Sequence, residues 1–175
     1  IRYLRAHSER FRIDPEHFGV MGESAGGYLT AMAALANDPA FDVGGYTDYS
    51  SRVQAACPLY PPTDVSGFPY NSPVEAAASP ESLMLGMNVM LQKEEALKAC
   101  PVSFVTKDAP PFMILHGIND HTVPFGQGEV LHDRLEEAGC DVRLIAIEGA
   151  DHADKQFFQR ETWKWIADFF HEKLG

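Results

Sequence analysis

Short apolar runs alternate with longer segments in which apolar residues recur at helical spacing. The runs have the length of buried strands and cover residues 17–22, 52–59, 112–115 and 142–147. The helical patterns cover residues 1–11, 25–37, 126–138 and 157–174. Strands that alternate with helices favour right-handed crossovers, so the pattern predicts an α/β fold with a parallel sheet flanked by helices.

Residues 60–110 interrupt this alternation. They contain seven of the twelve prolines, too many for an uninterrupted helix or sheet. Two short helices are expected within them, over 81–91 and 93–100, with Ser79 as the cap of the first. Three methionines spaced three apart predict a core-facing stripe: Met84, Met87 and Met90. We expect one domain over residues 1–175, with 60–110 as a cap-like insertion.

Composition and charge narrow the classes of function. Hydrophobic residues make up 45% and charged residues 22%, as in ordinary globular proteins. The net charge of −11 argues against binding to nucleic acid or to anionic membrane surfaces. No apolar run approaches the roughly 18 residues of a membrane span. Three cysteines are too few for a disulfide framework and favour a reducing compartment, so we expect a cytoplasmic location.

The hexapeptide 22–27, Gly-Glu-Ser-Ala-Gly-Gly, matches G-x-S-x-G and lies directly between a predicted strand and a predicted helix. A serine on so sharp a turn has strained backbone angles, so Ser24 needs small neighbours. The motif supplies three glycines: Gly22, Gly26 and Gly27. The Ala25 N–H at the helix N-terminus would stabilise an oxyanion, whereas Glu23 is expected to give local hydrogen bonding. A glycine-rich helix cap with an idle serine is the alternative.

A nucleophilic serine needs a base, and the base needs an orienting acid. Asp120 follows the third apolar run and His152 follows the fourth. Because the carboxyl ends of parallel strands meet at one edge of the sheet, we expect Ser24, Asp120 and His152 to lie there together. Their chain order, Ser…Asp…His, is the order of an α/β-hydrolase triad.

Other assignments of the same residues remain open. Asp64, after the second run, is a weaker candidate for the acid, and Asp151 is expected to be solvated at the surface. His116 is expected to structure its loop. A metal site formed by His116, Asp120 and His121 is conceivable, but no second cluster supports it. We therefore expect no metal and no cofactor.

The motif 22–27, the stretch 109–124 and the stretch 148–152 together resemble α/β-hydrolase esterases. The nearest group is the bacterial feruloyl-esterase-like and acetyl-esterase-like carboxylesterases, near the hormone-sensitive-lipase branch. The resemblance covers nearly the whole chain. It implies a lipase-like serine esterase that acts through an acyl-enzyme, on small acyl groups such as an acetyl or a cinnamoyl-type acid on a sugar.

Such esterases have a larger sheet and a His-Gly-Gly loop upstream of the nucleophile. The His-Gly of this chain, at 116–117, lies downstream of Ser24. We therefore expect a partial α/β-hydrolase fold, the C-terminal portion of an esterase. The run 17–22 then has only 52–59 as a neighbour, and its free edge predicts association into a homo-oligomer.

Two alternatives to an esterase remain. A serine peptidase of the prolyl-oligopeptidase type shares the fold and the order of the motifs. A non-catalytic fragment that retains the triad would have the same residues without the activity.

Overall fold

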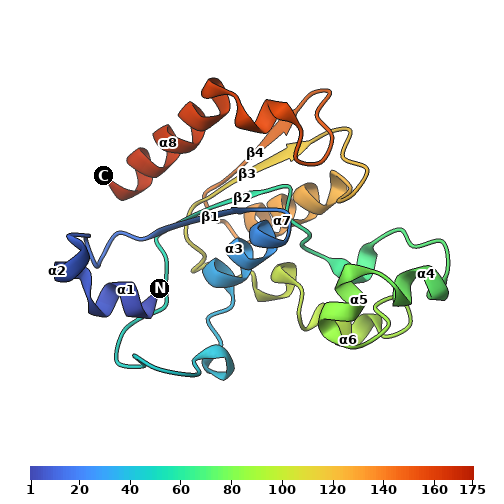
Figure 1. Ribbon diagram of the computed structural model, residues 1–175, viewed down its shortest axis with the longest axis horizontal. Coiled ribbons are helices and arrows are strands. Elements are labelled where there is room, and N and C mark those ends of the chain that lie inside the picture. The colour runs from blue at the N-terminus through green and yellow to red at the C-terminus, as the bar shows by residue number, and fades with distance from the viewer.

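A four-stranded parallel sheet forms the centre of the computed structural model, which describes residues 1–175 (Figure 1). The strands lie side by side in chain order: β1 (Gly19–Glu23), β2 (Ala55–Leu59), β3 (Phe112–Gly117) and β4 (Val142–Ile147). All three pairings are parallel. Glu23 pairs with Leu59, Leu59 pairs with Leu115 near the end of β3, and Gly117 pairs with Ile147. The carboxyl ends of the four strands therefore share one edge, as the sequence predicts.

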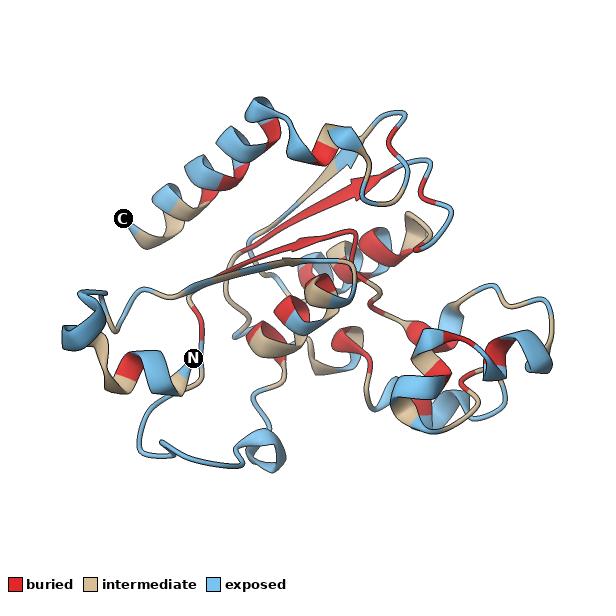
Figure 2. Cartoon of the chain, in the orientation of Figure 1, coloured by how far each residue is buried: buried red, intermediate tan, exposed pale blue.

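Helices cover both faces of the sheet (Figure 1). Helices α3 (Ala25–Leu35) and α7 (Gly126–Glu137) pack on one face, and α8 (Arg160–Leu174), preceded by the 3-10 helix η4 (Lys155–Phe158), packs on the other. Strand β2 packs against the helices on both faces of the sheet. Ala56 packs on the side of α3, and Cys57 packs on the side of α8. The two central strands are buried along their whole length (Figure 2).

The predicted helix over residues 1–11 is wrong in two respects. It is divided at His7 into α1 (Arg2–Ala6) and α2 (Ser8–Phe11), because the His7 backbone leaves the helical region at φ −117° and ψ 25°. The apolar side chains that make up its helical pattern do not face the core but are exposed: Ile1, Leu4 and Phe11. Arg5 is buried instead, and its guanidinium donates to the backbone carbonyls of three residues: Pro15, Ser50 and Arg52. These bonds satisfy the buried charge.

Most of residues 60–110 form a separate group of short helices beside the sheet (Figure 1). They are η2 (Val65–Gly67), α4 (Pro73–Ala77), α5 (Pro80–Leu85) and α6 (Lys93–Leu97). The last short helix of the segment, η3 (Pro101–Phe104), packs instead against α3 and α7. The segment has a small core of its own, formed by Val65, Val89, Ala96 and Cys100. Whether it acts as a cap stays a prediction. One further 3-10 helix, η1 (Pro39–Phe41), lies in the loop between α3 and β2.

Ser79 caps α5 as predicted, because its hydroxyl accepts the Ser82 N–H at 3.2 Å. The predicted methionine stripe is wrong. Gly86 adopts a left-handed conformation, φ 66°, and ends α5 after Leu85, so Met84, Met87 and Met90 do not share one helix. Met84 is 55% exposed.

Strand β1 lies at the edge of the sheet and pairs with β2 alone. It was expected to be buried, but its residues alternate between exposed and half-buried, because only the face that carries Val20 packs against the core on the α3 side. The expected single neighbour is confirmed. No helix has both the length and the apolar character needed to cross a membrane.

Candidate active site

Ser24 occupies the turn between the last residue of β1 and the first residue of α3. Its backbone is in the left-handed region, φ 53° and ψ −118°, the strained conformation expected for an exposed nucleophile. A Cβ at Gly22 would lie 2.5 Å from the Gly26 carbonyl oxygen, and one at Gly27 would lie 2.7 Å from the Leu59 carbonyl oxygen. Both positions therefore require glycine. Gly26 was also expected to be needed for its small size, but a Cβ there would meet nothing within 4 Å.

The Ala25 N–H is the first amide of α3 and has no hydrogen-bond acceptor in the structure. An unpaired amide at a helix N-terminus attracts negative charge. The neighbouring Ser24 N–H instead donates to the Leu59 carbonyl at 3.0 Å, which ties the turn to β2. The free amide is thus held next to the serine hydroxyl, where an oxyanion would form.

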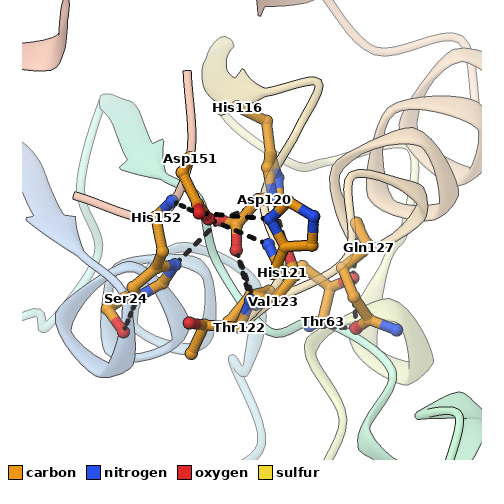
Figure 3. A network of polar contacts seen from close by, with 10 residues as sticks. All are labelled: Ser24, Thr63, His116, Asp120, His121, Thr122, Val123, Gln127, Asp151 and His152. Carbon is orange, nitrogen blue, oxygen red and sulfur yellow. Dashed lines mark hydrogen bonds and ion pairs between the residues drawn. The ribbon is translucent and has the colours of Figure 1, made fainter. Parts of the chain in front are cut away.

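His152 joins Ser24 and Asp120 into one chain of hydrogen bonds (Figure 3). Its Nε2 lies 2.9 Å from Ser24 Oγ, and its Nδ1 lies 2.8 Å from Asp120 Oδ2. A carboxylate can only accept, so Nδ1 carries the proton and Nε2 presents its lone pair to the serine hydroxyl. Ser24 and His152 are 128 residues apart in the chain, and the sequence predicts that all three residues lie in different loops. The structure brings them together.

Asp120 is buried, and both of its oxygens are occupied. Oδ1 accepts the Thr122 N–H at 2.9 Å and the Val123 N–H at 2.7 Å, while Oδ2 faces His152. The side chain has no solvent exposure, and that of His152 has 16%. Backbone amides of its own loop therefore fix the orientation of the carboxylate.

The loop that carries Asp120 and the loop that carries His152 approach each other closely. The Asn119 N–H donates to the Ala150 carbonyl at 3.1 Å. A Cβ at Gly117 would lie only 2.4 Å from that carbonyl oxygen, so this approach requires glycine at the end of β3. Gly117 thus allows the loops that carry Asp120 and His152 to approach each other.

Asp151 also bridges these two loops (Figure 3). Its Oδ1 accepts the His121 N–H at 3.0 Å and the His152 N–H at 2.7 Å. These amides, together with the His121 side chain at 3.1 Å, lower the pKa of Asp151 to about 2. Asp151 was expected to be solvated; it is exposed, but it is engaged in hydrogen bonds that link the acid and base loops.

His116 is fully buried at the end of β3 and lies under the acid loop. Its Nε2 donates to the Val123 carbonyl at 2.9 Å, consistent with the expected structural role, and lies 3.5 Å from Asp120 Oδ2. Burial lowers the pKa of His116, so the ring is neutral at neutral pH. Its Nδ1 has no hydrogen-bond partner.

The structure does not assemble the other candidate sites. His121, one of the three residues considered for a metal, turns its side chain to Asp151 instead. The one group of metal-binding residue types that lies close together is elsewhere, on α7: His132, Asp133 and Glu136. Asp64, the weaker candidate for the acid, accepts the Ser66 and Gly67 amides and caps η2.

Tyr60 is a residue of the site that the sequence reasoning missed. It follows the last residue of β2, at the same edge as the other three, and is fully buried. Its ring lies edge-on to the His152 ring, with 4.7 Å between centroids. The signal that could have found it is its position, directly after the strand that separates the serine from the acid.

Several known proteins similar to this chain are esterases. The probable carboxylic ester hydrolase LipM of Mycobacterium tuberculosis is 34% identical over 78% of this chain, and esterase LipQ of the same organism is 32% identical over 87%. A truncated carbohydrate esterase from gut microbiota superposes with a TM-score of 0.89 at 28% identity, covering 98% of this chain and 65% of that one.

The chain spans about a third of the length of its curated relatives, 32% of LipM and 36% of LipQ. The sheet and helices described above are therefore similar to one part of those proteins. The BD-FAE family model matches residues 1–135. The chain belongs to the BD-FAE family and has an α/β-hydrolase esterase fold.

Proposed function

We propose that this chain carries the catalytic triad of a carboxylic ester hydrolase, formed by Ser24, His152 and Asp120. The observation that carries the proposal is the hydrogen-bond chain from Ser24 Oγ through the imidazole to the buried carboxylate, at 2.9 and 2.8 Å. The strained serine at the strand-to-helix turn and the free Ala25 amide support it. Esterases among the similar proteins make ester cleavage the favoured reaction.

The geometry suits acyl transfer in two steps. In the first, Ser24 Oγ attacks the ester carbonyl carbon while His152 Nε2 accepts the hydroxyl proton. The Ala25 N–H donates to the resulting oxyanion, and Asp120 stabilises the imidazolium. His152 then protonates the departing alcohol, which leaves an acyl-enzyme. In the second step, water attacks the acyl-enzyme, again with His152 as base, and frees the acid.

The substrate class is proposed from the resemblance to esterases of small acyl groups. One similar structure is described as a carbohydrate esterase, and another, esterase 2 of Thermogutta terrifontis at 25% identity, was solved with butyrate bound. We therefore propose esters of short acyl groups, with a sugar as the alcohol. The two steps proposed for their hydrolysis use the side chains of Ser24, His152 and Asp120, the Ala25 amide and water.

A serine-directed fluorophosphonate tests the nucleophile directly. The purified protein should be labelled at Ser24, as located by peptide mass spectrometry, and should hydrolyse p-nitrophenyl acetate. Ser24→Ala should abolish both, while its thermal unfolding stays that of the parent. Labelling at another residue, or full hydrolysis by Ser24→Ala, would contradict the proposal. No reaction in a folded protein would favour the non-catalytic alternative.

A peptidase of the prolyl-oligopeptidase type is a second candidate. The acylamino-acid-releasing enzyme of Rattus norvegicus is 26% identical over 81% of this chain, and that similarity favours it. Labelling does not separate the two, because both use an activated serine. The ratio of turnover on p-nitrophenyl acetate to turnover on N-acetylalanine p-nitroanilide does. A higher kcat/KM on the anilide would favour the peptidase.

A further inference from the structure

Tyr60 has an unusual backbone for a large aromatic residue. Its φ is 37°, in the left-handed region, although it is neither glycine nor asparagine. Its N–H donates to the Leu115 carbonyl of β3 at 2.7 Å, which holds the backbone in this conformation. Such strain persists only where the surroundings impose it, and it is most frequent at functional sites.

The ring of Tyr60 is enclosed between two other rings. It lies edge-on to Phe157, with 4.5 Å between centroids and 71° between planes, and edge-on to His152, at 4.7 Å and 65°. Such edge-to-face contacts are favourable and directional. Phe157 is itself fully buried in the core under α8. The core of the protein therefore supports Tyr60, and Tyr60 in turn forms a wall against the imidazole of the base.

The hydroxyl of Tyr60 is fixed as well. It donates to Glu23 Oε2 at 2.5 Å. Burial and the nearby carboxylate raise the pKa of Tyr60, so the hydroxyl remains a donor at neutral pH. Glu23 is the residue directly before Ser24 in the turn. Tyr60 thus contacts the nucleophile turn at one end and the base along its ring.

We infer that Tyr60 is a positioning residue for His152, with Glu23 holding its ring in place. The inference rests on the proposed triad. The bond from Nδ1 to Asp120 anchors one end of the imidazole but leaves the ring free to swing about that contact, which would carry Nε2 away from Ser24 Oγ. The Tyr60 ring blocks this motion. A misplacement of about 1 Å at a reacting atom costs about a hundredfold in rate.

Substitutions at Tyr60 separate this role from simple filling of the core. Tyr60→Leu removes the wall and should lower kcat for p-nitrophenyl acetate about a hundredfold. Tyr60→Phe keeps the ring and loses only the hydroxyl, so it should lose about tenfold, a loss that one hydrogen bond to a charged group can account for. KM should stay within about twofold in both, because the substrate does not touch Tyr60 in this scheme. A residue that only filled the core would lower the melting temperature and leave kcat of the folded protein unchanged.

A double-mutant cycle tests the part played by Glu23. Glu23→Ala should lower kcat about as much as Tyr60→Phe. The double variant should be no worse than either single variant, because both substitutions remove the same hydrogen bond. Glu23→Gln keeps an acceptor and should recover most of the activity. Tyr70→Phe is the matched control, since the Tyr70 hydroxyl donates to Glu81 at 2.8 Å far from the triad. It should leave kcat unchanged.

The results divide cleanly. Parental kcat in Tyr60→Phe and Tyr60→Leu, with Ser24→Ala inactive, would overturn this inference and leave the proposed function intact. If the double variant of Tyr60→Phe and Glu23→Ala loses kcat by the product of the two single losses, the two residues act independently, and Glu23 does not hold the Tyr60 ring. Full activity of Ser24→Ala would overturn the proposed function, and this inference with it. If Tyr60→Leu does not fold, Tyr60→Phe and the cycle still decide.

Discussion

Asp120→Asn is the sharpest test of the acid, because the structure fixes how the new amide would lie. Asp120 Oδ1 accepts two backbone amides, from Thr122 and Val123. An asparagine must keep its oxygen there to satisfy both, since its NH₂ group cannot accept. The NH₂ group would then face His152 Nδ1, where the carboxylate now accepts at 2.8 Å.

That arrangement forces the wrong tautomer on the base. An NH₂ donor requires an acceptor, so His152 Nδ1 would present its lone pair and Nε2 would carry the proton. Nε2 could then no longer accept the proton of Ser24, although it lies 2.9 Å away. Neutralising the acid of such a triad while keeping its geometry lowers kcat about ten-thousandfold. This corresponds to about 5.5 kcal/mol of transition-state stabilisation.

The assay is kcat for p-nitrophenyl acetate, with thermal unfolding to show that the variant is folded. Asp64→Asn is the matched control, because Asp64 caps η2 and makes no contact with His152. Because asparagine caps a helix about as well as aspartate, this variant should change both stability and activity little. Asp120→Asn with kcat within about threefold of the parent, or a larger loss in Asp64→Asn, would show that the acid is misassigned.

Four further outcomes are expected. Gly27→Ala should lower the melting temperature by about 5 °C or more, because its Cβ would strike the Leu59 carbonyl at 2.7 Å. Gly26→Ala should not lower it, because its Cβ would meet nothing and alanine favours the helix; calorimetry on both variants checks this. The Asp151 carboxylate, with a pKa lowered from 3.8 to about 2, stabilises the fold above pH 3.8 and loses this effect as pH falls through 2. Asp151→Asn should therefore reduce the decrease in unfolding free energy between pH 3.8 and about 2, measured by denaturant unfolding. An unchanged pH dependence in the variant would contradict the assigned hydrogen bonds. EDTA should leave turnover unchanged, and a loss restored by zinc would revive the metal site. Met21→Lys should weaken any self-association through β1, measured by sedimentation, and equal association in both forms would show that this edge is not the contact.

The strands and the proximity of Ser24, Asp120 and His152 could be predicted from the sequence because they depend on local pattern and chain order. The fourth strand was expected over 142–147 and is observed as Val142–Ile147. Once the sheet is parallel, residues that follow its strands must meet at one edge, so the chain order of Ser24, Asp120 and His152 was enough to bring them together. Glycine at Gly22 and Gly27 followed from the sharpness of the turn.

The features that were missed depend on contacts between distant segments. Arg5 lies at a position that a helical pattern assigns to solvent, and the carbonyls of residues 15, 50 and 52, brought near by the fold, make its burial favourable. The methionine stripe failed because a single left-handed glycine, Gly86, ends the helix early. Tyr60 had no motif to mark it, since its role depends on Phe157 and His152, which are about a hundred residues away along the chain.

The parallel register of the sheet has a consequence for folding. Ser24 and His152 leave the first and the fourth strand, so their 2.9 Å contact is measured across two intervening strands. A slip of one residue in any pairing would move a loop by about 3.3 Å, which is more than a hydrogen bond tolerates, and would turn the side chains of that strand to the opposite layer. The contact between Ser24 and His152, and with it the proposed reactivity of Ser24, can therefore form only after all four strands have docked. The rate at which a refolding sample regains fluorophosphonate reactivity should then follow the slowest protection of β3 and β4 amides in hydrogen exchange.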